Sequence, residues 1–459
     1  MTQADRSRLP EVGANPSFTF PPIVKQRLAN GLSVWCVEQH ALPLISVLLI
    51  VPAGSASDPK ALPGLASLTG DMLDEGSGAH SAIEMHEAFA RIGVQLEIEV
   101  GADATLISIT ALSRFISRGL ALLADCVVRP SLLDRDVERV RQLRLNRLVQ
   151  LRDLAPAVAD RAFMQTLYQD HPYGHLAIGT ESALREMTVG DVMTFHAGAY
   201  LASRSTLVAV GDIQADAFAQ IAQEAFGGWT RGEGEGPVVD FQAARVEPPP
   251  SSGRRLTVVD KAGAAQSELR IGHVAASRDT PDYVPLLVLN TVLGGQFVSR
   301  INMKLREEKG YTYGARTSFD FRRGRGPFLL QTSVQTEMTA EAIKEIFQEL
   351  EDIRRDRPVT ENELALAKYA LTRGYAKNFE TSEQLARALT QLIVHGLPDD
   401  YYDLFSRRVL QMDTATVAGT AAKWLQPETM LTLVVGDRQR LEPSLGSIGL
   451  GAATVLVPA

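Results

Sequence analysis

The chain has 459 residues, of which 45% are hydrophobic and 22% are charged, and its formal net charge is −8. This length exceeds a single core and predicts two to four globular domains, while the acidic balance without a basic block argues against nucleic acid as a partner. No stretch approaches the roughly 20 apolar residues of a membrane span, and residues 1–18 contain no hydrophobic signal segment. Cys36 and Cys126 lie among apolar residues, so we expect buried, reduced thiols.

The first half of the chain mixes predicted strands and helices. Clusters of β-branched and large apolar residues predict strands at 32–37, 45–51, 94–100, 104–111 and 205–210. Helical patterns cover 65–73, 114–127, 132–152, 189–200 and 215–226, and a further helix ends near Tyr168. Another helix is expected to start at Ser81, because Ser81 and Glu84 have the spacing of a capping box.

A change of composition separates the two halves. Residues 227–253 are rich in Gly, Glu, Pro and Ser, as is typical of an interdomain linker. We therefore predict a first domain at 1–230, a linker at 231–253 and a second domain at 254–459. In the second domain, strands are expected at 256–259, 268–272, 312–321, 328–334 and 431–435, and capping boxes at Thr360 and Thr381.

The second domain repeats the first. Met187–Asp212 aligns without a gap on Met412–Asp437, and both segments end in a valine-rich strand followed by Val-Gly-Asp. A repeat of half the chain indicates a duplicated domain rather than a solenoid unit. Because strands and helices do not alternate strictly, the predicted fold class is α+β. We expect two pseudo-symmetric domains that face each other across a cavity, like a clam-shell, where ligands bind.

The histidines do not suggest a metal site. His80, Glu84 and His86 lie close in sequence, but Glu84 is explained by the capping box and the spacing does not place two imidazoles on one helical face. His171 and His175 flank Pro-Tyr-Gly, which predicts a turn, and no carboxylate or cysteine completes a ligand set there.

Six arginines mark the helix predicted at 132–152, and Arg141, Arg144 and Arg147 are spaced three residues apart along one face. One interpretation is a solvated helix. The alternative is a cationic cavity wall or a docking surface for an acidic partner.

The segment Leu293–Tyr313 contains the strongest candidate for chemistry. Gly294-Gly295 interrupts a long apolar helix, a second helix is expected to start at about Ser299, and Gly310 should stop it. Arg306 and Tyr313 follow near the start of a strand. Both donate hydrogen bonds without losing a proton, which suits a developing oxyanion. The alternative is a surface ion pair of Arg306 with Glu307 or Glu308.

Taken together, these features resemble the M16 family of zinc metallopeptidases, the pitrilysin, insulysin and mitochondrial processing peptidase group, and within it the short bacterial branch. The matching motifs are the two Val-Gly-Asp ends, the His171-to-His175 loop and the segment from Gly294-Gly295 to Tyr313. The resemblance implies that Arg306 and Tyr313 hold the substrate backbone and stabilise the tetrahedral intermediate. It also implies that Gly294, Gly295 and Ser299 help to admit and bind substrate.

The zinc motif of the family is degenerate in this chain. In the family, two histidines and a general base form His-x-x-Glu-His; the resemblance places them here at Ser67, Asp71 and Gly70. The downstream glutamate ligand belongs in the arginine-rich helix, where 139–152 contains no carboxylate. We therefore expect no metal and no cofactor in this chain.

In heteromeric members of the family, one subunit carries the zinc motif and the other lacks it. The resemblance implies that this chain is the metal-free partner of a zinc-bearing paralogue of similar length in a heterodimer, and is inactive alone. A homodimer is the alternative state when the partner is absent. The substrates would be peptides that bind in extended form. A periplasmic location is expected from the resemblance, with the cytoplasm as the alternative. The competing hypothesis is a catalytically inert scaffold or peptide-binding protein.

Overall fold

The computed structural model describes residues 13, 18–78, 80–230, 238–251 and 253–456. Residues 231–237 and 252 of the predicted linker lie outside the described residues. In the described part of the chain, no helix is long and apolar enough to cross a membrane. Cys36 and Cys126 are buried free thiols, as expected.

The first half forms a six-stranded sheet with the order β1-β2-β8-β3-β7-β6. Its strands are β1 Val24–Arg27, β2 Ser33–Glu38, β3 Leu44–Val51, β6 Glu97–Val100, β7 Thr105–Leu112 and β8 Thr206–Gly211. The pair β2–β8 is parallel and the other pairs are antiparallel. The short strands β4 Gly76–Ser77 and β5 His80–Ser81 form a separate ribbon.

The second half repeats this topology except at one edge, where the last strand pairs in parallel with its neighbour, whereas β1 pairs antiparallel with β2. Its sheet has the order β11-β12-β10-β13-β9-β14, and β13–β9 is parallel like β2–β8. The strands are β9 Arg255–Asp260, β10 Gln266–Val274, β11 Ala315–Phe319, β12 Pro327–Gln335, β13 Leu431–Gly436 and β14 Thr454–Leu456. The repeated Val-Gly-Asp segments therefore end in equivalent strands, β8 and β13. The chain has the predicted α+β architecture.

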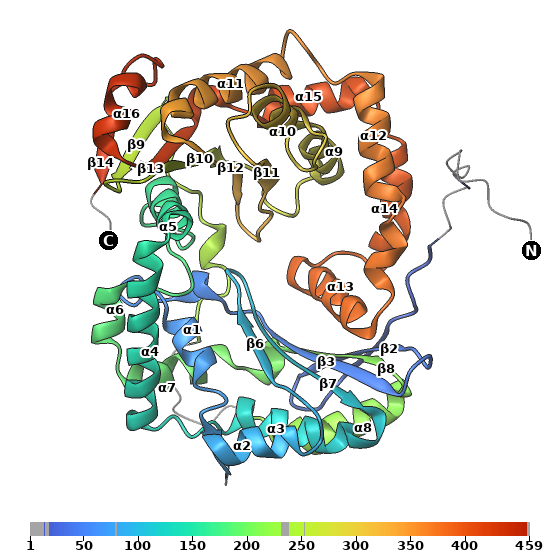
Figure 1. The fold of residues 1–459 in the computed structure, drawn as a ribbon. Helices are drawn as coiled ribbons and strands as arrows, with labels where there is room; N and C mark the ends of the chain where they lie inside the picture. Colours follow the sequence, from blue (N-terminus) through green and yellow to red (C-terminus); the bar gives the residue numbers. More distant parts are fainter. Residues whose placement is uncertain (1–12, 14–17, 79, 231–237, 252, 457–459) are drawn as a thin grey trace, which may run out of the picture.

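Sixteen labelled helices surround the sheets in the described residues (Figure 1). The first half contains α1 Leu65–Asp71, α2 Ala82–Ala90, α3 Ile116–Val128, α4 Asp134–Asp153, α5 Ala155–Tyr168, α6 Glu181–Glu186, α7 Val189–Ala199 and α8 Ala215–Phe226. The second contains α9 Tyr283–Leu293, α10 Arg300–Asn302, α11 Thr339–Asp352, α12 Glu361–Thr372, α13 Ser382–His395, α14 Tyr401–Leu410, α15 Thr414–Trp424 and α16 Arg438–Leu445. The capping boxes at Ser81, Thr360 and Thr381 are confirmed.

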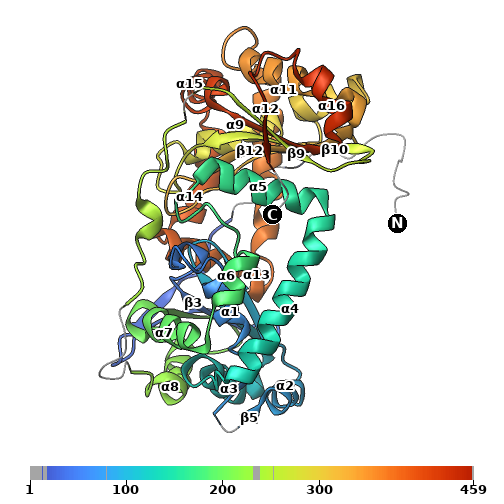
Figure 2. The ribbon, with the colours of Figure 1, turned by 90° about the vertical axis from the view of Figure 1, so that its left-hand side faces the viewer.

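The two halves exchange one helix each. Helix α5 comes from the first half but packs on β10 and β13 of the second sheet, whereas α13 comes from the second half and packs on β3 and β8 of the first (Figures 1 and 2). The α5 contact includes an ion pair of Asp160 Oδ1 with Arg270 Nε at 2.6 Å. Each half thus covers part of the core of the other.

The turn between β11 and β12 is hydrogen-bonded to the first half of the chain. The hydroxyl of Tyr173 donates to Asp103 Oδ1 at 2.7 Å and accepts from the Gly324 backbone N–H at 3.0 Å. The backbone N–H of Arg323 donates to Asp103 Oδ2 at 2.8 Å. Between the halves, a cavity of about 750 Å³ is lined by parts of β3, β7 and the first turns of α13.

Candidate functional site

The double glycine, Gly294-Gly295, lies where the end of helix α9 packs against strand β11. A Cβ on Gly294 would lie 2.5 Å from Thr317 Oγ1 of β11, and one on Gly295 would lie 2.6 Å from Asn290 Nδ2 of α9. The Thr317 backbone N–H donates to the Gly294 carbonyl at 3.1 Å. These glycines therefore permit the close approach that the sequence predicts, and the approach is to β11 and α9 of the same chain.

Ser299 begins the next helix but is itself buried. Its hydroxyl donates to the carbonyl of Gln296 at 2.6 Å, inside the turn that leads into α10. The chain continues from α10 into a π-helical turn over Met303–Glu308, a wide turn that is frequent at functional sites. Gly310 then adopts a φ of 67°, the glycine stop that the sequence predicts.

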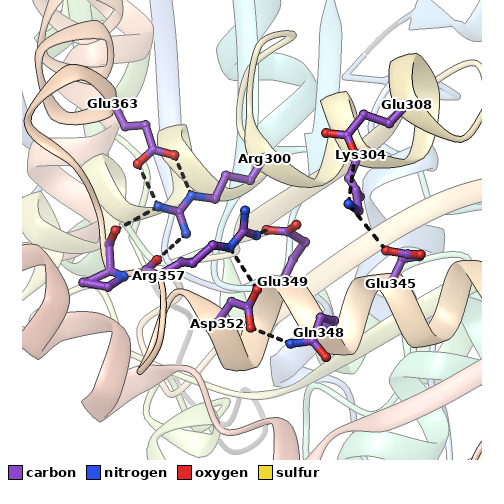
Figure 3. Close-up of polar contacts among 10 residues, drawn as sticks. Arg300, Lys304, Glu308, Glu345, Gln348, Glu349, Asp352, Arg357 and Glu363 are labelled. Atoms are coloured by element: carbon purple, nitrogen blue, oxygen red, sulfur yellow. Dashed lines mark hydrogen bonds and ion pairs between the residues drawn. The ribbon is translucent and has the colours of Figure 1, made fainter.

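A network of ion pairs fixes this segment to α11 and α12 (Figure 3). Arg300 makes a bidentate pair with Glu363, at 2.6 Å from Nε and 2.7 Å from Nη2, and donates to the carbonyls of Arg357 and Pro358 at 2.5 and 3.0 Å. Burial alone would raise the pKa of Glu363, but the bonds from Arg300 and Thr360 outweigh it and lower this pKa to about 2. The carboxylate therefore holds both Arg300 and the N-terminus of α12.

Arg306 and Tyr313 project from this anchored segment. The Arg306 guanidinium lies over the ring of Phe297, 4.4 Å from its centroid, and its Nε is 3.4 Å from Glu307 Oε1. Tyr313 is 91% exposed and makes no hydrogen bond with any described residue. It lies in the loop before β11, because that strand begins at Ala315 and not at the predicted Thr312. The two side chains are thus both accessible, but no hydrogen bond among the described residues joins them.

Two residues of this site are not predicted from the sequence. Phe297 is 57% exposed and lies against the Arg306 guanidinium. The side chain of Asn302 donates to the Phe297 carbonyl at 2.6 Å and accepts from the Ala315 backbone N–H at 3.0 Å. This buried amide ties the turn that carries Phe297 to the start of β11. In the sequence, the signal for this structural role is a polar residue between the apolar Ile301 and Met303.

The degenerate zinc positions lie on α1 and do not fit a zinc ion. Ser67 and Asp71 both accept hydrogen bonds from Arg144 of α4, at 3.0 and 2.5 Å. A Cβ on Gly70 would lie 2.9 Å from Val100 Cγ2, so this position has little room for a glutamate. A hydroxyl, a paired carboxylate and a guanidinium do not form a zinc ligand set. Within the described part of the chain, no three His, Cys, Asp or Glu residues are grouped to hold a metal elsewhere.

The other candidates have structural roles. His171 bonds the Val246 carbonyl at 3.0 Å and accepts from the Tyr173 backbone N–H, and burial lowers its pKa. His175 contacts Asp58 at 2.9 Å. On α4, Arg141 donates to the Met187 carbonyl at 2.6 Å and Arg147 to Gln150 at 3.2 Å. Arg141 and Arg144 are thus used in packing within the fold while Arg147 is exposed, so only part of the stripe faces solvent.

Comparison with known proteins agrees with this architecture. Residues 34–181 match the family described as Insulinase (Peptidase family M16), and residues 186–371 match the Peptidase M16 inactive domain. A Mycobacterium tuberculosis protein named an uncharacterized zinc protease is 27% identical over 372 residues, 80% of this chain and 83% of that protein. A Helicobacter pylori protein named a non-peptidase homolog is 21% identical over 379 residues, 82% and 85% of the two chains.

Two crystal structures share the fold. The peptidase M16 inactive domain from Pseudomonas fluorescens aligns with a TM-score of 0.83 and 25% identity, over 91% of this chain and 98% of that one. A protease from Helicobacter pylori aligns with a TM-score of 0.85 and 20% identity, over 91% and 100% of the two chains. The two family matches together span most of the chain, and the chain belongs to peptidase family M16.

Proposed function

We propose that this chain is the metal-free subunit of a heteromeric zinc metalloendopeptidase that degrades or processes peptides. In this proposal a paralogue with an intact His-x-x-Glu-His motif supplies the zinc, and this chain supplies Arg306 and Tyr313. The observation that carries the proposal is an anchored segment that exposes a hydrogen-bond donor: the Arg300–Glu363 pair fixes the segment, while Tyr313 is 91% exposed. Arg306 of the same segment is half-exposed and pairs with Glu307.

The chemistry of the pair suits peptide cleavage. When water attacks a peptide carbonyl, negative charge develops on the carbonyl oxygen, and fixed donors lower the energy of that state. A guanidinium stays charged and a phenol stays protonated near neutral pH, so both remain donors throughout the reaction. Phe297 restricts the Arg306 side chain by stacking, which favours a preformed donor geometry.

The proposal is tested by mixing experiments with the purified chain and a zinc-bearing paralogue. Cleavage of a short unstructured peptide should require both proteins. Tyr313→Phe should lower kcat by about 10²-fold or more, because it removes one oxyanion donor, while association of the two proteins is unchanged. Tyr369→Phe is the matched control, since Tyr369 is also exposed but lies on α12. An unchanged rate in the Tyr313→Phe variant would show that Tyr313 has no catalytic role.

The second candidate is an inert scaffold or peptide-binding subunit. It is favoured by the similarity to the Helicobacter pylori protein named a non-peptidase homolog. In that case the chain would bind a partner or a peptide, but substitutions at Arg306 and Tyr313 would leave every measured rate unaltered. Activity of the mixture that depends on Tyr313 separates the two functions.

We further propose a periplasmic location and a heterodimer as the active form, with the cytoplasm and an inactive homodimer as the alternatives. Cell fractionation with an antibody against the chain tests the first. Size-exclusion chromatography with light scattering, with and without the paralogue, tests the second.

A further inference from the structure

Arg144 is a buried cation at the place where the M16 zinc motif is degenerate. It lies on α4 with 8% of its surface exposed, on the same helical stripe as the buried Val140 and Leu148. Arginine is rarely buried to this degree unless it is paired, because removing an unpaired charge from water is strongly unfavourable. The burial of Arg144 therefore requires acceptors that compensate its charge.

The guanidinium joins three separate parts of the first half. Its Nη1 donates to Ser67 Oγ at 3.0 Å and to Asp71 Oδ2 at 2.5 Å, two residues that lie one turn apart on α1. Its Nη2 donates to the carbonyl of Ala177 at 3.0 Å, in the loop before α6. One positive group thus connects α1, α4 and this loop, and Asp71 provides the compensating charge.

The packing next to Arg144 reinforces this arrangement. Gly70 lies between Ser67 and Asp71 on the same short helix, and β6 lies so close that a Cβ there would be 2.9 Å from Val100 and 3.5 Å from Ile98. A histidine pair at 67 and 71 would face the guanidinium and not an empty space. The side of the site towards β6 and α4 is therefore filled by the protein itself, while the Asp71 side chain is 44% exposed at its edge.

We propose that Arg144 is a built-in replacement for the metal ion: its guanidinium cross-links α1, α4 and the 176–178 loop, and it excludes divalent cations from this position. Arginine suits this role because its planar fork reaches three acceptors in different directions, whereas a lysine ammonium is a single point of charge. The inference concerns the first half of this chain alone and does not depend on the proposed partner.

The cross-linking role is tested by a double-mutant cycle in the full chain. Arg144→Met keeps most of the side-chain volume but removes the charge, and should lower the midpoint of urea unfolding, as should Asp71→Asn. The double variant should lose less than the sum of the two single variants, because the two groups interact directly. Arg147→Met, an exposed neighbour on α4, should leave the midpoint unaltered. An Arg144→Met variant as stable as wild type, or additive losses, would overturn the cross-link.

The exclusion of metal is tested by restoring ligands with and without Arg144. Ser67→His/Asp71→His should bind no stoichiometric Co²⁺, whereas the same variant with Arg144→Glu should bind it with a visible d–d absorption band, because the guanidinium is gone and a carboxylate is added. Circular dichroism checks that both variants are folded. Equal Co²⁺ binding by both, or binding by neither folded variant, would overturn the claim that Arg144 is what excludes the ion.

Discussion

At the scale of single residues, Gly294 and Glu363 determine where Arg306 and Tyr313 are placed. Gly294 allows β11 to approach the end of α9, and Glu363 anchors Arg300 at the start of α10. Neither residue needs to touch a substrate for its substitution to alter the site, so their effects on stability can be measured without an activity assay.

We expect Gly294→Ala to destabilise the protein by about 1–3 kcal/mol, because the new Cβ would lie 2.5 Å from Thr317 Oγ1 and 2.8 Å from the Thr317 backbone nitrogen. Backbone cannot move aside as a flexible side chain can. Gly419→Ala on α15 is the control: it has nothing within 4 Å, and alanine in a helix should stabilise slightly. Urea unfolding of both variants measures the difference; equal effects would contradict the close approach at Gly294.

Glu363 should make stability depend on pH in the acid range. Its pKa is lowered from an ordinary 4.5 to about 2 in the folded protein, so its ionised form stabilises the fold. That contribution is fully present above pH 4.5 and is lost as the pH falls towards 2, and it amounts to a few kcal/mol. Glu363→Gln should flatten this part of the stability profile, while Glu361→Gln in the same turn should retain it. A Glu363→Gln variant with the wild-type acid profile would argue against the pair.

At the scale of secondary-structure elements, the sequence predicts what is set by local chemistry. The capping boxes at Ser81, Thr360 and Thr381 and the glycine stop at Gly310 depend only on neighbouring residues, and the structure contains all four. The edge strands β1 and β14 were not predicted, because three or four residues with mixed burial give no clear alternation.

The features that the sequence does not predict depend on tertiary contacts. In the sequence Arg144 is one member of a charged stripe, and in the structure α1 packs against it and buries it. The spacing of Val140, Arg144 and Leu148 on one face was the available signal that this arginine points towards the core. Likewise, the position of Tyr313 in a loop depends on Asn302, which fixes the start of β11 from a distance in the sequence.

At the scale of the whole molecule, the exchange of α5 and α13 makes the two halves interdependent. Leu48, Ile50 and Val208 of the first half belong to the same buried cluster as Leu385 and Leu389 of α13. Arg270 of the second sheet, which is buried, pairs with Asp160 of α5. Since each sheet is covered by a helix of the other half, we expect the chain to unfold as one cooperative unit despite its duplicated sequence.

This arrangement gives an expectation for a protein cleaved between its halves. A protease site inserted within residues 231–237 and then cut should yield two fragments that co-elute in size-exclusion chromatography and unfold in a single transition, because the contacts of α5 and α13 remain. Expressed separately, each fragment should aggregate, since it would expose the sheet face that the missing helix covers. Leu389→Ala, which weakens the packing of α13 on the first sheet, should promote separation of the cut fragments. The same substitution should leave the oligomeric state of the uncut chain unchanged. Two fragments that separate and stay folded on their own would show instead that each half has a self-sufficient core.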